Sequence, residues 1–198
     1  MLSVYQIKPA FQRLLKPSMF LLRKWGCSPN HLSLFTIFFS VGVGSLFFLY
    51  PQRPFVFLLI PLGLFLRMAL NALDGMMART FHLQSEWGEV LNELGDVISD
   101  LAISLPLLSL SFFHPLIILA FSFMSVIMEF IGVLAKALGK ERAYEGPMGK
   151  SDRAVLIGLF CLYFYFFPPN LLLANSLFGI ASILMILGSI FRIKAALK

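Results

Sequence analysis

Six long apolar segments alternate with shorter polar ones along the chain. They lie near residues 32–50, 54–73, 90–113, 115–137, 153–168 and 171–191. A helix of about 20 apolar residues crosses the roughly 30 Å hydrocarbon core of a bilayer. The segments at 90–113 and 153–168 fit this description least well, the former because it begins with several carboxylates. The pattern predicts an all-α, polytopic membrane protein with six transmembrane helices.

The first 28 residues show a different pattern. Apolar side chains recur at helical spacing with lysines between them, at Val4, Ile7, Phe11, Leu14 and Leu15. This is typical of an amphipathic helix that lies in the membrane interface, ended or bent at Pro9 and Pro17. We therefore predict a single domain over 1–198, with an interfacial helix at 1–28 and a six-helix bundle at 32–191.

The composition agrees with a membrane protein. Of the 198 residues, 59% are hydrophobic and 13% are charged, whereas about 25% of an average soluble domain is charged. So few charges cannot cover a soluble surface, and two cysteines exclude a disulfide scaffold. The formal net charge of +6 raises the question of a nucleic-acid partner, which the placement of the charges decides.

The basic residues gather on one side of the predicted membrane. All of them except Arg53 and Arg67 lie in or beside the segments 1–31, 74–89, 138–152 and 192–198. The turns at 51–54, 114–115 and 168–170 are short and almost uncharged. Because basic loops stay in the cytoplasm, both termini are predicted to be cytoplasmic. The same asymmetry explains the positive charge without nucleic acid.

The acidic residues are concentrated in one stretch. Six of the ten are Asp74, Glu86, Glu89, Glu93, Asp96 and Asp100. A charge inside a membrane is costly and points to a functional site, so this cluster requires a water-filled cavity or a cation. On helices, Asn71, Asp74 and Ala78 share one face, and Asn92, Asp96 and Asp100 share another. Oxygen ligands of this kind suit Mg²⁺, Mn²⁺ or Ca²⁺.

The spacing of these residues matches a known motif. The pattern Asp74-Gly-x-x-Ala-Arg, then eight residues, Gly88, three residues, position 92, three residues, Asp96 resembles the DxxDGxxAR(x8)GxxxDxxxD motif of the CDP-alcohol phosphotransferase family. The segments 28–33 (Ser-Pro-Asn-His-Leu-Ser) and 149–153 (Gly-Lys-Ser-Asp-Arg) also resemble family segments. Two of the four motif aspartates are replaced here, by Asn71 and Asn92.

The resemblance implies a role for each matching residue. Asp96 would be the general base that takes the proton of the acceptor alcohol, and Mg²⁺ or Mn²⁺ would be held by Asp74, Asn71, Asn92 and Asp96, with Asp100 as a further candidate. Gly75, Ala78, Arg79 and Gly88 would bind the CDP moiety. A phosphate on the donor or acceptor would be bound by Lys150, Arg153 and Arg142.

The implied activity is that of a membrane phosphatidyltransferase of phospholipid biosynthesis, which joins CDP-diacylglycerol to a small polar alcohol and releases CMP. The resemblance also implies a prokaryotic cell membrane, an active site at its cytoplasmic face and a homodimer. Two alternatives stay open: a CDP-alcohol:diacylglycerol phosphotransferase, and a non-catalytic CDP-lipid-binding homologue, which the two asparagines favour. A transporter is disfavoured because no paired half-repeats occur.

Some charged residues have a second interpretation. Asp100, Glu89 and Glu93 would face the aqueous cavity without binding metal, and Lys150 and Arg153 would be basic residues of a cytoplasmic loop. Glu129 lies deep in the segment 115–137 and outside the motif. A structural hydrogen bond or an ion pair with Arg67 would explain it.

Overall fold

The computed structural model describes residues 8–51 and 53–197, and every regular element in this part of the chain is helical. The elements in chain order are α1 (Lys8–Lys24), α2 (Pro29–Leu49), α3 (Pro54–Thr80), α4 (Glu86–Ser104), the short 3-10 helix η2 (Leu105–Ser109), α5 (Pro115–Ala137), α6 (Lys150–Phe166) and α7 (Leu171–Ala196).

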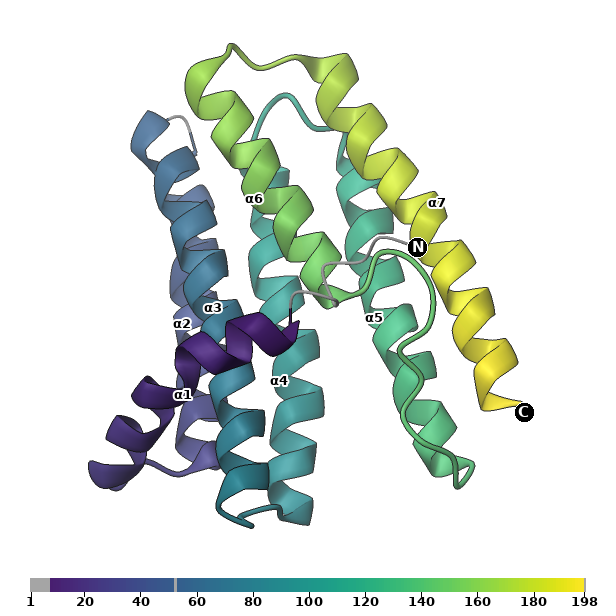
Figure 1. Cartoon of the computed structure of the whole chain (residues 1–198). Coiled ribbons are helices and arrows are strands. Elements are labelled where there is room, and N and C mark those ends of the chain that lie inside the picture. The colour runs from purple at the N-terminus through teal and green to yellow at the C-terminus, as the bar shows by residue number, and fades with distance from the viewer. Residues whose placement is uncertain (1–7, 52, 198) are drawn as a thin grey trace.

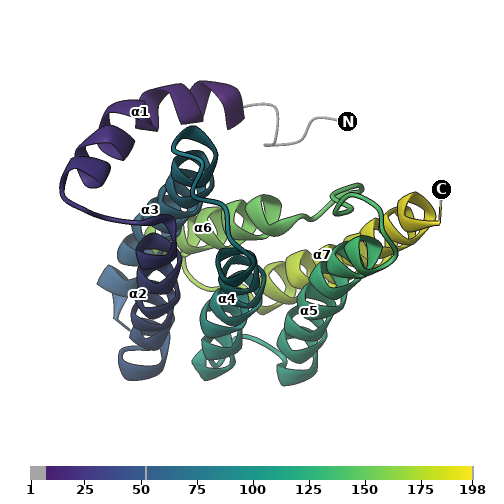
Figure 2. The ribbon, with the colours of Figure 1, turned by 90° about the horizontal axis from the view of Figure 1, so that it is seen from below.

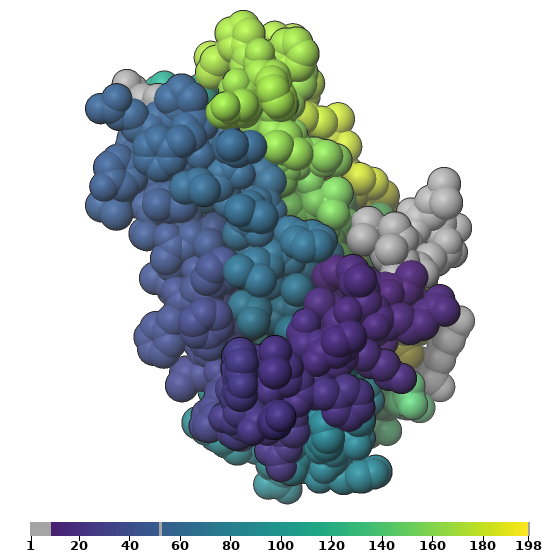
Figure 3. Space-filling model, turned by 60° about the vertical axis from the view of Figure 1, so that its left-hand side comes forward, coloured from purple at the N-terminus to yellow at the C-terminus, as the bar shows by residue number. Residues whose placement is uncertain are grey.

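Helices α2 to α7 form a bundle, and α1 lies across its outside (Figures 1 and 2). Within the bundle, α2 packs on α3 and α4, α3 packs on α6, and α5 packs on α7. The space-filling view shows α1 covering the α2–α3 side of the molecule (Figure 3). Met19 of α1 is fully buried there, in a small apolar cluster with Leu73 and Met77 of α3. This packing ties the crossing helix to the bundle.

Four of the helices are long and apolar enough to cross a membrane: α2, α3, α5 and α7. Their most apolar stretches have mean hydropathies between 2.0 and 2.4. Large apolar side chains point outward from them, among them Phe38, Phe48, Leu62, Phe123 and Leu172. Soluble proteins rarely expose so much contiguous apolar surface, which indicates that lipid covers it.

The elements differ from the predicted ones at several points. The segment 90–113 is not one helix, because α4 ends at Ser104 and the chain continues as η2, which contains Pro106. Proline lacks the N–H that would continue an α-helix and crowds the preceding turn. Helix α1 does not end at Pro17, so of the two outcomes that the sequence predicts there, an end or a bend, only the end is excluded. Residues 1–7 of the predicted interfacial helix lie outside the described residues.

Aromatic and charged side chains occupy different parts of the interior. Near the turns at 110–115 and 167–170, Phe112, Phe113, Phe160 and Phe178 pack with ring centroids 4.9 to 6.1 Å apart. Ion pairs and hydrogen bonds join most of the buried charged residues to one another or to the motif residues of α3 and α4; these residues are Arg67, Asp74, Asp96, Asp100, Glu129, Arg153 and Arg192. The fold therefore concentrates its buried charge where the motif lies.

Candidate active site

The motif residues face one another across α3 and α4. Asn71 and Asp74 of α3 and Asn92 and Asp96 of α4 line one small cavity, together with side chains of α2. Asp74 is 4% exposed and Asp96 is 3% exposed. Two nearly buried carboxylates beside each other are unfavourable unless opposite charge or hydrogen bonds compensate them, so their partners define what the site can do.

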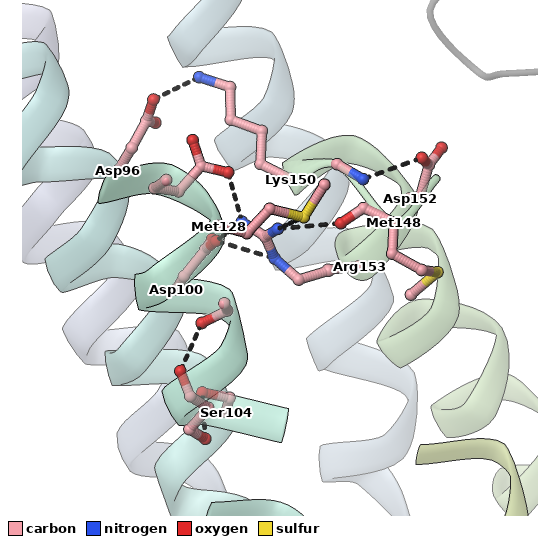
Figure 4. A network of polar contacts seen from close by, with 12 residues as sticks. Asp96, Asp100, Ser104, Met128, Met148, Lys150, Asp152 and Arg153 are labelled. Atoms are coloured by element: carbon pink, nitrogen blue, oxygen red, sulfur yellow. Dashed lines mark hydrogen bonds and ion pairs between the residues drawn. The ribbon is translucent and has the colours of Figure 1, made fainter. Parts of the chain in front are cut away.

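Each carboxylate has specific partners. Ser33 of α2 donates to Oδ2 of Asp74 at 2.9 Å, and the backbone N–H of Gly75 donates to Oδ1. The Asn71 amide donates to Oδ1 of Asp96 at 3.1 Å. Lys150, at the start of α6, reaches Oδ2 of Asp96 at 2.5 Å (Figure 4). The predicted residues Asn71, Asp74, Asp96 and Lys150 therefore come together at one place.

The donor set of this cavity fits a divalent cation of the Mg²⁺ type. Its polar side chains are carboxylates, amides and hydroxyls, the hard donors that Mg²⁺ and Mn²⁺ prefer. Ser99 lines the cavity, and its buried hydroxyl has no hydrogen-bond partner among the residues that the structure describes. Within the described part of the chain, no three His, Cys, Asp or Glu side chains group as a metal site, because Asn71 and Asn92 stand where carboxylates would complete such a group.

The small residues of the motif have clear local roles. The Arg79 guanidinium folds back over Gly75, where a Cβ would lie 3.4 Å from its Nη1 atom. Gly88 packs against Asn30, and a Cβ there would lie 2.7 Å from the Asn30 Oδ1 atom. Gly88 thus allows the start of α4 to approach the start of α2, a contact that the sequence does not reveal. Ala78 is half-buried and Arg79 is exposed on the same turn.

The structure places Asp100 outside the cavity that Asp74 and Asp96 share. One Asp100 oxygen accepts from Arg67 of α3 at 2.6 Å, and the other accepts from Arg153 of α6. Both oxygens are thus paired with guanidinium groups rather than turned toward the cavity. Figure 4 shows Arg153 meeting Asp100 one helical turn away from the Lys150–Asp96 pair.

The other acidic candidates are also paired. Glu89 pairs with Lys136 at an exposed position, where such a contact contributes little to stability. Glu93 pairs with Arg142 at 2.9 Å. Burial opposes the charged form of Arg142, but the carboxylates of Glu93 and Glu129 outweigh it and hold its pKa above the usual value. Arg142 therefore stays cationic while it is bound to these two acids.

The suggested pairing of Glu129 with Arg67 is wrong. Glu129 pairs with Arg142, Arg153 and Arg192, while Arg67 pairs with Asp100. Sequence reasoning treated Arg192 only as a basic residue at the end of a span. The sequence could have indicated a buried ion pair here, because Arg192 lies on the apolar segment of α7, where a cation needs a buried partner.

Comparison with known proteins identifies the family. Residues 27–193 match the model of the family described as CDP-alcohol phosphatidyltransferase. "Inner membrane protein YnbA" of Escherichia coli (strain K12) is 44% identical over 196 residues, which cover 99% of this chain and 97% of that protein. An "Uncharacterized protein" of Aquifex aeolicus (strain VF5) is 35% identical over 95 residues, 48% of this chain and 46% of that protein.

Solved structures share the fold. The crystal structure of Mycobacterium tuberculosis phosphatidylinositol phosphate synthase (PgsA1) with CDP-DAG bound superposes with a TM-score of 0.76 at 22% identity, covering 93% of this chain and 94% of that chain. The structure of the same protein with manganese and citrate gives 0.75 at 21% identity, covering 92% and 88%. With its apolar helices and its inner-membrane relative, the chain is an integral membrane protein. The family match over most of its length shows that it belongs to the CDP-alcohol phosphatidyltransferases.

Proposed function

We propose that this protein transfers the phosphatidyl group of CDP-diacylglycerol to a small polar alcohol, with release of CMP, in phospholipid synthesis. The observation that carries the proposal is the convergence of Asn71, Asp74, Asn92 and Asp96 on one buried cavity. A site of buried carboxylates beside a lipid-facing helical bundle suits a substrate with a diphosphate head and acyl tails. The structural relative with CDP-DAG bound supports the same class of donor.

The proposed topology has six spans in a single domain. Helices α4 and α6 would cross the membrane with the four more apolar helices, because they lie among them in the bundle (Figure 1). The charged segments at 74–89 and 138–152 and both termini would then be cytoplasmic, as the positive-inside rule requires. The site would open to the cytoplasmic face, with α1 lying in the interface. A homodimer is proposed from the family resemblance.

A divalent cation, Mg²⁺ or Mn²⁺, would be held by Asp74 and Asp96 with oxygen atoms of Asn71 and Asn92. When bound, such an ion neutralises the diphosphate and stabilises the departing oxygen. The two remaining carboxylates match the charge of one divalent ion. The relative that was crystallised with manganese supports this class of metal.

The chain's own residues would carry the proton transfer and the binding. Asp96 would accept the proton of the acceptor hydroxyl as its oxygen forms a bond to the phosphorus that carries the diacylglycerol. The bond from that phosphorus to CMP breaks, and CMP leaves with the electron pair. Arg79 would bind the CDP phosphates, and Gly75 and Ala78 would keep the surface of α3 beside it free of bulky side chains. Gly88, which packs against Asn30, would contact the nucleotide only through its backbone. Lys150 would hold Asp96 in place until the substrates enter.

The test is CMP release by purified protein in detergent. Release is expected only when CDP-diacylglycerol, an alcohol and Mg²⁺ or Mn²⁺ are all present, because the alcohol supplies the attacking oxygen. Omitting each component in turn serves as the control. A CDP-alcohol donor that releases CMP with diacylglycerol, while CDP-diacylglycerol does not, would reverse the assignment of donor and acceptor.

A second candidate function is binding of a CDP-lipid without turnover. Asn71 and Asn92 favour it, since each removes a negative charge from the site, and so does the pairing of both Asp96 oxygens. This function predicts that CDP-diacylglycerol raises the thermal stability of the protein with Mn²⁺ while CMP never accumulates. The same samples therefore distinguish the two functions.

Replacing Ser33 by Ala is expected to weaken metal binding. The Ser33 hydroxyl donates to Asp74, and loss of such a supporting hydrogen bond typically costs 10- to 100-fold in metal affinity, so we expect about a tenfold rise in the Mn²⁺ concentration for half-maximal thermal stabilisation. Ser45→Ala on the same helix is the control, because the Ser45 hydroxyl bonds only the carbonyl of Gly42. An unchanged Mn²⁺ dependence in Ser33→Ala would remove Ser33 from the site.

A further inference from the structure

A buried network of charges lies beside the motif, on the flank of α4 that faces α5, α6 and α7. We define the Glu129 network by its members: Arg67, Glu93, Asp100, Glu129, Arg142, Arg153 and Arg192. Arg142, Arg153, Asp100 and Glu93 were candidates from the sequence motif or its flanks, but the proposed reaction uses none of the network's carboxylates. Its purpose therefore needs a separate explanation.

Glu129 is the centre of this network. It lies in the middle of α5, and its side chain is 4% exposed. Its Oε2 atom accepts from Arg142 at 2.7 Å, and its Oε1 atom lies 2.9 Å from Arg153 and 3.6 Å from Arg192. Gly132, one turn further along α5, leaves room for this arrangement, because a Cβ there would lie 3.1 Å from the Arg192 Nη1 atom. One carboxylate thus faces three guanidinium groups from three different elements.

The remaining contacts bind the arginines further. Arg142 also pairs with Glu93, and Arg153 also pairs with Asp100. The backbone carbonyls of Met148 and Met128 accept from Arg153 and Arg192 at 3.0 and 2.6 Å. With Lys150, Asp96 and Asp74 included, the interior holds five cationic and five anionic side chains. Each arginine of the network is therefore already paired with a carboxylate before a substrate or a metal binds.

The pairing of these arginines affects which acceptor can bind, because Asp96 lies beside them on α4. Along α4, Glu93 and Asp100 lie one turn to either side of Asp96 and both belong to the network. Figure 4 shows Lys150 and Arg153 approaching α4 from the same direction, onto Asp96 and Asp100. An acceptor that reached Asp96 from this flank, on the side away from the motif cavity, would lie against arginines that already pair with carboxylates. A phosphate monoester carries a charge of about −1.5 to −2 at pH 7 and would have to displace Glu129, leaving a buried carboxylate without a partner.

From this geometry, and resting on the proposed function, we propose that Glu129 restricts the acceptor to an alcohol that carries no phosphate group. Its carboxylate holds the position that a phosphate would take among Arg142, Arg153 and Arg192. Glu129 is a specificity-determining residue in this scheme. The acceptor reaches Asp96 through hydroxyl groups alone, and the acceptor class is a neutral or zwitterionic alcohol such as a polyol or an amino alcohol.

The test compares matched acceptors with and without phosphate. CMP release from CDP-diacylglycerol is measured with glycerol against glycerol 3-phosphate, inositol against inositol phosphate, and serine against phosphoserine. We expect at least one unphosphorylated acceptor to exceed its phosphorylated partner by about tenfold or more, because a site discriminates strongly against a ligand that leaves one of its buried groups unpaired. Faster release with a phosphorylated acceptor would overturn this inference and leave the proposed function standing. If none of these acceptors supported CMP release, both this inference and the proposed function would be overturned.

A variant tests Glu129 itself. Glu129→Gln keeps the shape and removes one negative charge, so the ratio of rates with the phosphorylated and unphosphorylated acceptors should rise by about tenfold. Glu145→Gln is the control, because Glu145 is an exposed carboxylate of the neighbouring loop and its loss should leave the ratio unchanged. Thermal stabilisation by glycerol 3-phosphate gives a readout without turnover: it should appear in Glu129→Gln and not in the original protein. An unchanged ratio in folded Glu129→Gln, or stabilisation of the original protein, would overturn the proposal.

Discussion

Replacing Asp96 by Asn is expected to lower the rate of CMP release by about 10²- to 10⁴-fold, the usual contribution of a positioned general base. Asparagine keeps an oxygen for the metal and a similar shape, but it cannot take the proton of the acceptor alcohol. Binding of CDP-diacylglycerol should therefore survive. The rate of CMP release measures the first effect, and thermal stabilisation by CDP-diacylglycerol with Mn²⁺ measures the second.

Glu89→Gln is the matched control for Asp96→Asn. It removes a carboxylate from the same helix, but this carboxylate forms an exposed pair with Lys136, and such pairs contribute at most about 1 kcal/mol. Its rate should stay close to that of the original protein. If Asp96→Asn instead retained a near-normal rate, Asp96 would not be the base. Asp100 would be a poor replacement, because both of its oxygens are paired with arginines.

The sequence predicted the helix bounds best where an apolar segment begins at a proline. The segment 115–137 coincides with α5, which begins at Pro115, since proline favours the first turn of a helix. The segment 90–113 was misjudged because apolar side chains continue past Ser104, although Pro106 changes the backbone from α to 3-10 geometry. Hydropathy records how apolar a segment is and does not record which hydrogen bonds it forms.

Sequence spacing also predicted which motif residues would meet, because positions three or four apart share a helix face. It failed for Asp100. Four residues carry a side chain about 6 Å further along the helix and about 40° around it, and this brings Asp100 to Arg67 and Arg153 instead of the motif cavity.

Contacts between distant segments could not be read from the sequence. Lys150 reaches Asp96, and Arg192 reaches Glu129, only because α6 and α7 have particular rotations within the bundle. Spacing along one helix carries no information about the rotation of another. For this reason the sequence left Glu129 with Arg67 as a partner, whereas packing places three other arginines around it.

Replacing Gly44 by Ala is expected to destabilise the protein strongly, because α2 and α4 touch at this position. A Cβ at Gly44 would lie 1.8 Å from the carbonyl oxygen of Ala102 and 2.7 Å from its carbonyl carbon. Backbone atoms cannot turn aside as a side chain can, so the two helices must separate. Overpacking typically costs 1 to 3 kcal/mol, and we expect about 3 kcal/mol here, or a midpoint of thermal unfolding about 10 °C lower.

Gly42→Ala provides an internal control on the same helix. Nothing lies within 4 Å of a Cβ at Gly42, and alanine favours the helix over glycine by about 0.5 to 1 kcal/mol, so the midpoint should stay the same or rise slightly. Circular dichroism at increasing temperature in one detergent measures both variants. Since α2 carries Ser33 and α4 carries Asp96, Gly44→Ala should also lower CMP release below that of Gly42→Ala at temperatures where both remain folded. Equal midpoints for the two variants would mean that α2 and α4 do not approach each other at Gly44, and the cavity between α2, α3 and α4 would then lose its geometric basis.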